Sequence, residues 1–215
     1  MDLRKAALAQ LRLATRLILE WEGREVRLIA GADFSYDLEK KRIASCIVVL
    51  DALSLKLVES SVAVCELKVP YIPGFLSLRE APSFFAAFRK IRNLPDVTLV
   101  DGNGIAHPRK MGLASYVGVL LDIPTIGCAK SAFFPYRAPA LKKGSMTIFR
   151  NEKNEKVGVC VRTRSGVKPV FVSPGHRTDF SISTKMVLES SRFRIPEPLR
   201  IAHLRAQRVF SPQTL

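Results

Sequence analysis

The stretch Val97-Thr98-Leu99-Val100-Asp101-Gly102-Asn103-Gly104-Ile105-Ala106-His107-Pro108 decides the fold. Its first four residues are apolar or β-branched, which is typical of a short strand that is covered on both faces of a sheet. The strand ends at Gly102-Asn103-Gly104, because glycine adopts backbone angles that other residues avoid. Asp101 therefore lies where a strand leaves the core. Taken alone, the stretch is equally compatible with a functional carboxylate and with an Asp that caps its own turn.

Length and composition indicate a single domain that spans residues 1–215. The chain has 215 residues, of which 47% are hydrophobic, and this is enough for one full core. No apolar run has the length of a membrane span. The first residues resemble the start of an amphipathic helix and lack the apolar core and cleavage site of a signal peptide. We therefore expect a cytoplasmic protein that does not bind membranes.

The chain is strongly basic, with 34 Lys and Arg residues against 19 acidic residues and a formal charge of +15. Such an excess favours a polyanionic partner, most often a nucleic acid. The alternative is an ordinary solvated surface in a basic proteome. The positive residues are dispersed along the chain and do not form a tail, which fits a basic face on a folded domain.

The four cysteines are far apart and form no CxxC pair: Cys46, Cys65, Cys128 and Cys160. This spacing suggests neither a zinc site nor a redox motif. Each lies among apolar or small residues, so buried and reduced thiols are expected.

In the first half of the chain the pattern predicts a helix, a three-stranded antiparallel meander, a rigid turn and a second helix. Pro70 and Pro73 stiffen the turn, since proline fixes φ. Pro82 is expected in the first turn of the second helix, with Glu80 just before it. The expected ranges are a helix over 2–22, strands over 26–36, 43–50 and 55–67, and the turn over 69–74.

The second half alternates strands and helices. A helix over 111–121 between the strands at 97–100 and 124–129 predicts a right-handed parallel crossover. Further expected elements are a hairpin of 146–150 with 157–163, a strand over 170–172, and helices over 181–190 and 198–209. The predicted fold class is α/β, a mixed sheet of a three-stranded meander plus parallel strands, flanked by helices.

Three carboxylates fall in comparable places in this scheme. Asp33 lies on the first strand, Glu80 at a helix start, and Asp101 at the end of the fourth strand. If the first and fourth strands are neighbours, Asp33 and Asp101 point into one pocket. Clustered carboxylates select a hard cation such as Mg²⁺, and such sites hydrolyse phosphodiesters. Taken singly, Asp33 and Glu80 could equally be a solvated strand residue and a helix N-terminal charge.

The motifs resemble the endonuclease V family, the deoxyinosine-directed repair nucleases with a ribonuclease H-like fold. The matching stretches span nearly the whole chain in the family's order. They are residues 31–36 (GADFSY), 70–76 (PYIPGFL) with 79–80 (RE), 100–109 (VDGNGIAHPR), 127–131 (GCAKS), 173–176 (SPGH) and 194–198 (RIPEP).

The resemblance implies a role for individual residues. Asp33, Glu80 and Asp101 would be the catalytic acids and hold Mg²⁺, for which Mn²⁺ can substitute. Lys130 would contact the scissile phosphate, and His203 falls where many members carry a fourth acid. The turn at 70–73 resembles the family's wedge, which enters the duplex beside a flipped base. Residues expected to contact the substrate are Pro70, Tyr71, Ile72, Pro73, Gly74, Leu76, Gly102, Gly104, His107, Gly112 and Leu113. His176 is a weaker candidate that could instead shape the Pro174-Gly175 turn.

The implied activity is a nick at the second phosphodiester bond 3′ to deoxyinosine in DNA, leaving a 3′-hydroxyl and a 5′-phosphate. The expected enzyme is a monomer and a Mg²⁺-dependent endonuclease of DNA repair. One alternative is an endoribonuclease that acts at inosine in RNA, because sequence alone does not reveal contacts to a 2′-hydroxyl. The other is a non-catalytic nucleic-acid-binding module of the same fold. The three intact acids argue against the second alternative.

Overall fold

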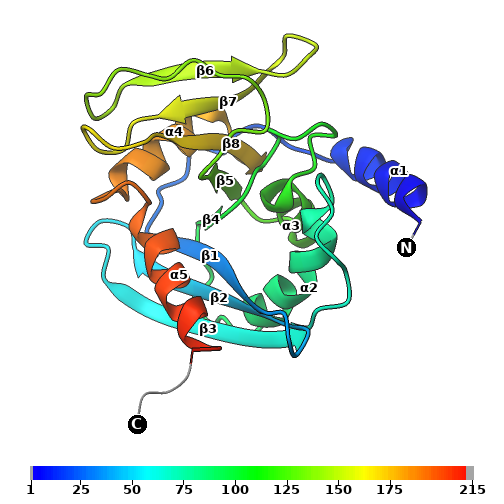
Figure 1. The fold of residues 1–215 in the computed structure, drawn as a ribbon. Helices are drawn as coiled ribbons and strands as arrows, with labels where there is room; N and C mark the ends of the chain where they lie inside the picture. The colour runs from blue at the N-terminus through cyan, green and yellow to red at the C-terminus, as the bar shows by residue number, and fades with distance from the viewer. Residues whose placement is uncertain (1, 212–215) are drawn as a thin grey trace.

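The computed structural model describes residues 2–211 and contains one eight-stranded sheet with helices on both faces (Figure 1). The strand order is β3-β2-β1-β4-β5-β8-β7-β6. The strands are β1 Leu28–Asp37, β2 Arg42–Asp51, β3 Leu57–Glu66, β4 Val97–Val100, β5 Thr125–Ala129, β6 Met146–Arg150, β7 Lys156–Val161 and β8 Val170–His176. The helices are α1 Leu3–Ala14, α2 Leu76–Phe88, α3 Leu113–Leu121, α4 Phe180–Glu189 and α5 Glu197–Arg208. Met1 and residues 212–215 of the expected single domain lie outside the described part.

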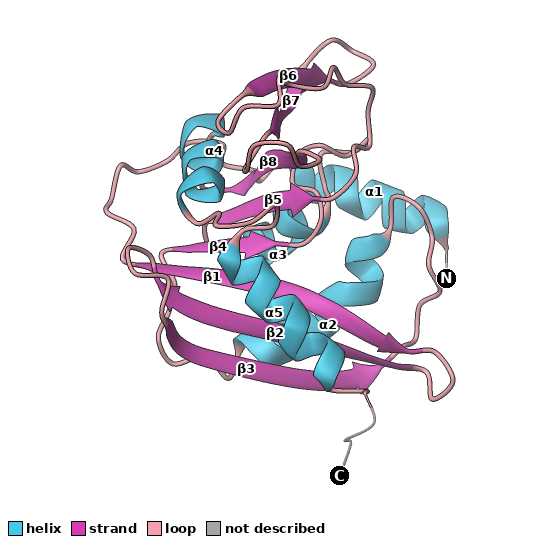
Figure 2. Ribbon diagram, turned by 60° about the vertical axis from the view of Figure 1, so that its left-hand side comes forward, coloured by secondary structure: helices cyan, strands magenta, loops and turns pink. Residues whose placement is uncertain are grey.

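The predicted sheet is confirmed. β1, β2 and β3 form the antiparallel meander, whereas β1, β4 and β5 are mutually parallel (Figure 2). The connection from β4 through α3 to β5 is the expected parallel crossover. The remaining strands, β8, β7 and β6, extend the sheet in antiparallel order.

Two apolar cores lie on opposite faces of the sheet because the central strands alternate between them. On β1, Ile29 packs with α4 and α5, whereas Ala30 packs with α2 and α3. Figure 1 shows α5 crossing β1 and β2, with α2 on the other side of these strands. At Gly31 a Cβ atom would lie 2.2 Å from the carbonyl carbon of Pro198. Gly31 therefore allows α5 to pack directly on β1.

Three predicted boundaries differ from the structure by more than two residues. The N-terminal helix ends at Ala14 and not at residue 22. Pro82 lies inside α2, which begins at Leu76, so Glu80 is within the helix and not before it. β8 continues to His176 and contains Pro174, although a central strand normally excludes proline. The β5–β8 register shifts at Thr125/Ile126, and this irregularity accommodates the proline.

The cysteine prediction is confirmed in part. All four thiols are free, and Cys46, Cys128 and Cys160 are buried, but Cys65 is only partly buried. Within residues 2–211, every helix falls short of the length and apolarity that a bilayer crossing requires.

Candidate active site

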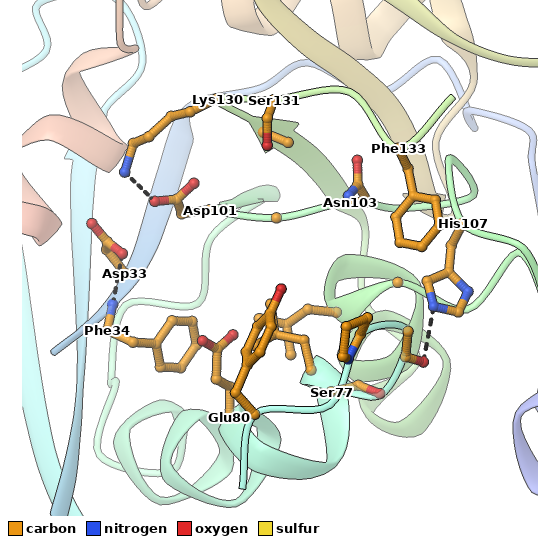
Figure 3. A pocket seen from close by; sticks show the side chains of 18 of the residues that line it. Asp33, Phe34, Ser77, Glu80, Asp101, Asn103, His107, Lys130, Ser131 and Phe133 are labelled. Atoms are coloured by element: carbon orange, nitrogen blue, oxygen red, sulfur yellow. Dashed lines mark hydrogen bonds and ion pairs between the residues drawn. The ribbon is translucent and has the colours of Figure 1, made fainter. Parts of the chain in front are cut away.

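The site forms where β4 ends before its neighbour β1. Val100, the last residue of β4, pairs with Ala32, but β1 continues to Asp37. The backbone N–H of Asp101 donates a hydrogen bond of 3.0 Å to the carbonyl oxygen of Ala32, and this bond is the last one between the two strands. Beyond this point β1 has no β4 residue beside it, so side chains from both faces of the sheet reach one space. Asp33 and Asp101 are therefore neighbours, as the sequence predicted (Figure 3).

Asp33 is buried, with 6% of its surface exposed. Its Oδ1 accepts a 2.7 Å hydrogen bond from the N–H of Phe34, and its Oδ2 lies 2.7 Å from Nδ1 of His203 on α5. Burial and the nearby Asp101 carboxylate raise the pKa of Asp33 to about 6. The site thus holds a carboxylate whose charge calls for a cation.

Asp101 forms an ion pair with Lys130, whose Nζ lies 2.5 Å from Oδ2. Lys130 directly follows β5, the parallel neighbour of β4, so both side chains leave the same edge of the sheet. Burial alone would lower the pKa of Lys130, but the charge and hydrogen bond of Asp101, together with the charge of Asp33, outweigh burial and raise this pKa. Lys130 is therefore a fixed positive charge beside the acids.

Glu80 approaches from α2, on the opposite face of the sheet from α5. Glu80 is 5% exposed, and its Oε1 accepts a hydrogen bond from the hydroxyl of Tyr36 on β1. Its Oε2 is buried and has no partner among the described residues. Burial, followed by the charges of Asp101 and Asp33, raises the pKa of Glu80 to about 8. A buried carboxylate oxygen without a donor is costly, so Glu80 is suited to an additional partner.

The turn of residues 70–74 borders the same cleft, and we call it the wedge turn after its resemblance to the family's wedge. Tyr71 is 67% exposed at its tip. The other end is held firmly, because the carbonyl oxygen of Gly74 accepts three hydrogen bonds. The donors are Nη2 of Arg109 at 2.6 Å, Nε2 of His107 at 3.0 Å and Nε2 of Gln10 at 3.3 Å. The turn is thus anchored at Gly74 and open at Tyr71.

His107 is a neutral anchor of this turn. Its Nδ1 accepts a 3.2 Å hydrogen bond from the N–H of Arg109, so its proton is on Nε2. Burial and the Arg109 charge lower the pKa of His107 to about 4. The ring also lies 5.6 Å, centroid to centroid, from Phe133 at the rim of the cleft (Figure 3).

A cleft of about 470 Å³ brings most of the predicted residues together. All five predicted catalytic residues line it, and so do nine of the residues expected to contact substrate. The first set is Asp33, Glu80, Asp101, Lys130 and His203. The second set is Tyr71, Ile72, Pro73, Gly74, Leu76, Gly102, His107, Gly112 and Leu113.

Three candidates do not line the cleft. Pro70 lies at the base of the wedge turn. Gly104 is a packing residue, since a Cβ there would lie 2.0 Å from the carbonyl oxygen of Pro174. His176 accepts a hydrogen bond from the N–H of Ile18 at Nδ1, and its Nε2 lies 3.0 Å from Oδ1 of Asp122. It therefore holds the segment after α1 and takes no part in the site.

Sequence reasoning missed several residues of the cleft, notably Tyr36, Asn103 and Phe133. Tyr36 carried a signal, because it lies on the strand of Asp33 within a matching motif. Phe133 carried only a weak one, as an apolar residue soon after Lys130. The Tyr36–Glu80 contact joins β1 to α2 and follows from no local pattern.

The acids do not form a closed metal cage. Within residues 2–211, no group of three or more His, Cys, Asp or Glu side chains is placed to hold a metal ion. Asp33 and Asp101 are nonetheless neighbouring oxygen donors, and Mg²⁺ is usually bound by one or two carboxylates together with water and substrate phosphate. The donor set therefore fits a hard cation that shares its shell with substrate.

A mixed sheet that brings carboxylates and a lysine together at the ends of its parallel strands provides groups suited to metal-dependent hydrolysis of phosphodiesters, the chemistry of a nuclease. The family profile described as Endonuclease V matches residues 11–204. The chain belongs to the endonuclease V family.

Relatives and solved structures agree with this assignment. An endonuclease V of Dictyoglomus turgidum is 45% identical over 203 residues, 94% of this chain and 88% of the relative. The endonuclease V structure from Streptomyces avermitilis has a TM-score of 0.92 and 39% identity, covering 99% of this chain and 94% of that one. A Ciona intestinalis endonuclease V, in complex with a 24-mer DNA that contains an inosine followed by a ribo-adenosine, has a TM-score of 0.87 and 29% identity. It covers 96% of this chain and 97% of that one.

Proposed function

We propose that the protein is a divalent-metal-dependent endonuclease that nicks DNA at the second phosphodiester bond 3′ to deoxyinosine, leaving a 3′-hydroxyl and a 5′-phosphate. One observation carries this proposal: the acids and an anchored, aromatic-tipped turn border the same cleft. The acids supply hydrolytic chemistry, and the turn supplies a means of opening the duplex. The Ciona complex supports inosine-containing DNA as the substrate class.

The cation is proposed to be Mg²⁺, with Mn²⁺ as a substitute, held by Asp33 and Asp101. When bound, it would neutralise the carboxylates and stabilise the negative charge that develops on the phosphate and the leaving oxygen. Glu80 is proposed as the third acid of the set, reached from the α2 side. Its unpartnered Oε2 supports this role.

Lys130 and His203 complete the proposed chemistry. Lys130 already faces an anionic oxygen of Asp101, and its ammonium would contact the scissile phosphate as a point charge. His203 holds Asp33 in place through Nδ1. A histidine can also transfer a proton near neutral pH, although it does not supply the negative charge that an acid at this position would supply.

We assign lesion recognition to the part of the cleft that is lined by the wedge turn and its neighbours. Tyr71 would fill the gap left by a displaced base, and Gly74, Leu76, Gly102, Gly112 and Leu113 would surround the flipped hypoxanthine. Flipping is least costly for a mispaired base, which favours a deaminated adenine over a normal one.

A cleavage assay on matched strands tests the proposal. Inosine-containing DNA, inosine-containing RNA and inosine-free controls are incubated with Mg²⁺, with Mn²⁺ or with EDTA, and the product ends are mapped. We expect metal-dependent cleavage of the inosine DNA only. Faster cleavage of the RNA would assign an endoribonuclease, and cleavage of neither would assign a binding module.

A further inference from the structure

Two loops beside the cleft carry a concentration of positive charge. Residues 135–144 and 162–169 contain six Lys or Arg residues and no Asp or Glu. We refer to these two segments as the basic lobe. Five of the six cations are exposed, namely Arg137, Lys142, Lys143, Arg164 and Lys168. Among residues 2–211, none of these five forms an ion pair with an acid.

The sixth cation, Arg162, joins the two loops into one unit. Arg162 is 5% exposed, and its guanidinium donates to the carbonyl oxygens of Pro139 at 2.7 Å, Ala140 at 3.1 Å and Val167. Backbone hydrogen bonds add to this, from Gly144 to Arg162 and from Gly166 to Leu141. The exposed cations are therefore displayed on an ordered surface, which reduces the entropy lost when they bind a partner.

The register of the sheet places the basic lobe on the same edge as the acids. Ala129, the last residue of β5, pairs with Phe171 near the start of β8, so Lys130 leaves the sheet where residue 169 enters it. Arg194 bridges the two. Its Nη2 donates to the carbonyl oxygens of Lys130 and Pro169, each at 3.1 Å, and its Nε donates to that of Lys168, also at 3.1 Å.

We propose that the basic lobe is a binding surface for the phosphate backbone of duplex DNA that extends beyond the cleft. Two joined loops with five exposed, unpaired cations and no acidic residue attract a polyanion, and their link to Lys130 through Arg194 places them next to the proposed position of the scissile phosphate. The inference rests on the proposed function, because it deepens the same activity by naming the surface that holds the substrate outside the cleft. The contacts are to phosphate, so they raise affinity for any DNA sequence.

The test compares three four-residue variants. The first replaces Lys142, Lys143, Arg164 and Lys168 by Gln. The second replaces four exposed cations near the opposite ends of β1 and β4 by Gln, namely Arg24, Lys56, Arg89 and Arg92. The third keeps the charge of the basic lobe, with Lys142→Arg, Lys143→Arg, Arg164→Lys and Lys168→Arg. Binding to a 30-mer inosine duplex is measured between 50 and 300 mM salt, and thermal unfolding confirms that each variant is folded.

We expect the first variant to bind about tenfold or more weakly at 100 mM salt. The slope of log K against log salt should become shallower by about 2 to 4, since each phosphate contact contributes about 0.9. The second and third variants should keep the wild-type slope. Equal slopes for the first and second variants would overturn the proposal. Wild-type cleavage of the same duplex is measured in parallel. Equal slopes with normal wild-type cleavage contradict only the role of the basic lobe, whereas absent wild-type cleavage contradicts the proposed endonuclease activity.

Discussion

Nη2 of Arg109 donates a 2.6 Å hydrogen bond to the carbonyl oxygen of Gly74, 35 residues earlier in the chain. The same guanidinium donates through Nε to Oε1 of Gln10 at 2.6 Å, and Nε2 of Gln10 donates to Oγ of Ser77 at 3.2 Å. Gln10 is 1% exposed, so this network is largely shielded from water. It connects α1 to the wedge turn and holds that turn against the cleft.

Replacing Gln10 by Met should therefore weaken lesion recognition. Met keeps the approximate volume but removes all the polar contacts. We expect KM for inosine-containing DNA to rise about five- to tenfold, which corresponds to about one hydrogen bond. The free energy of unfolding should fall by about 1–3 kcal/mol, since polar partners are left unsatisfied in the interior. Arg12→Met, an exposed change on the same helix, should alter neither quantity. A Gln10 variant that is less stable but binds inosine DNA normally would restrict the network to a structural role.

Asp33→Asn and Asp101→Asn should each lower metal-dependent nicking by about a hundredfold or more, because fixed charge at the reacting centre is lost. Stability at pH 7 should not fall for Asp33→Asn, since burial and Asp101 already disfavour the charged form. The matched control is Asp37→Asn on the same strand, whose carboxylate pairs with Arg42 instead. Single-turnover cleavage and thermal melting give both quantities. Near-wild-type cleavage by a folded Asp33 or Asp101 variant would show that the reaction takes place at another site.

Tyr71→Ala should reduce lesion binding and cleavage about tenfold or more, since stacking on a base is worth about 1–3 kcal/mol. The melting temperature should change little, because the side chain is 67% exposed and supports no core. Tyr71→Phe keeps the ring and should retain most of the activity. If Tyr71→Ala instead melts several degrees lower and cleaves normally, Tyr71 is a packing residue.

His107 should make the folded protein less stable in acid. Its pKa is about 4 when folded, against 6.5 for an ordinary histidine. Between these values the unfolded chain binds the proton and the folded chain does not, so the free energy of unfolding rises with pH across this window. The full contribution is about 3 kcal/mol, present above pH 6.5 and lost as the pH falls toward 4.

Urea unfolding of the wild type and His107→Gln at pH 4.5 and pH 7.5 isolates this contribution. The variant cannot titrate, so the difference between the two proteins should be larger at pH 7.5 than at pH 4.5. A difference that is the same at both pH values would show that His107 is not held neutral by the fold.

The local pattern of the chain is sufficient for most of the elements and for the place of Asp101 at a strand end, whereas the catalytic roles of the acids rest on the family resemblance. Residues 97–100 form a strand because four consecutive apolar or β-branched side chains can be buried on both faces, and Asp101 follows because the glycines end the strand. Period-two and helical patterns are short-range properties, so the meander, the crossover and the order of the motifs were all predictable. The same short range explains the errors. Residues 15–22 contain no helix-breaking residue, so the sequence does not reveal that the first helix ends at Ala14. Pro82 is typical of a first helical turn, but in the structure the helix begins at Leu76, directly after the wedge turn.

Only the tertiary structure decided how the acids face the cleft. β4 ends beside Ala32 while β1 continues, and this mismatch lets Asp33 and Glu80 approach from opposite faces of the sheet. Tyr36 reaches Glu80, and Gln10 reaches Gly74, across 44 and 64 residues respectively. Such contacts depend on which elements are packed together, because hydrogen bonds act over about 3 Å in space and carry no trace in the spacing of residues along the chain.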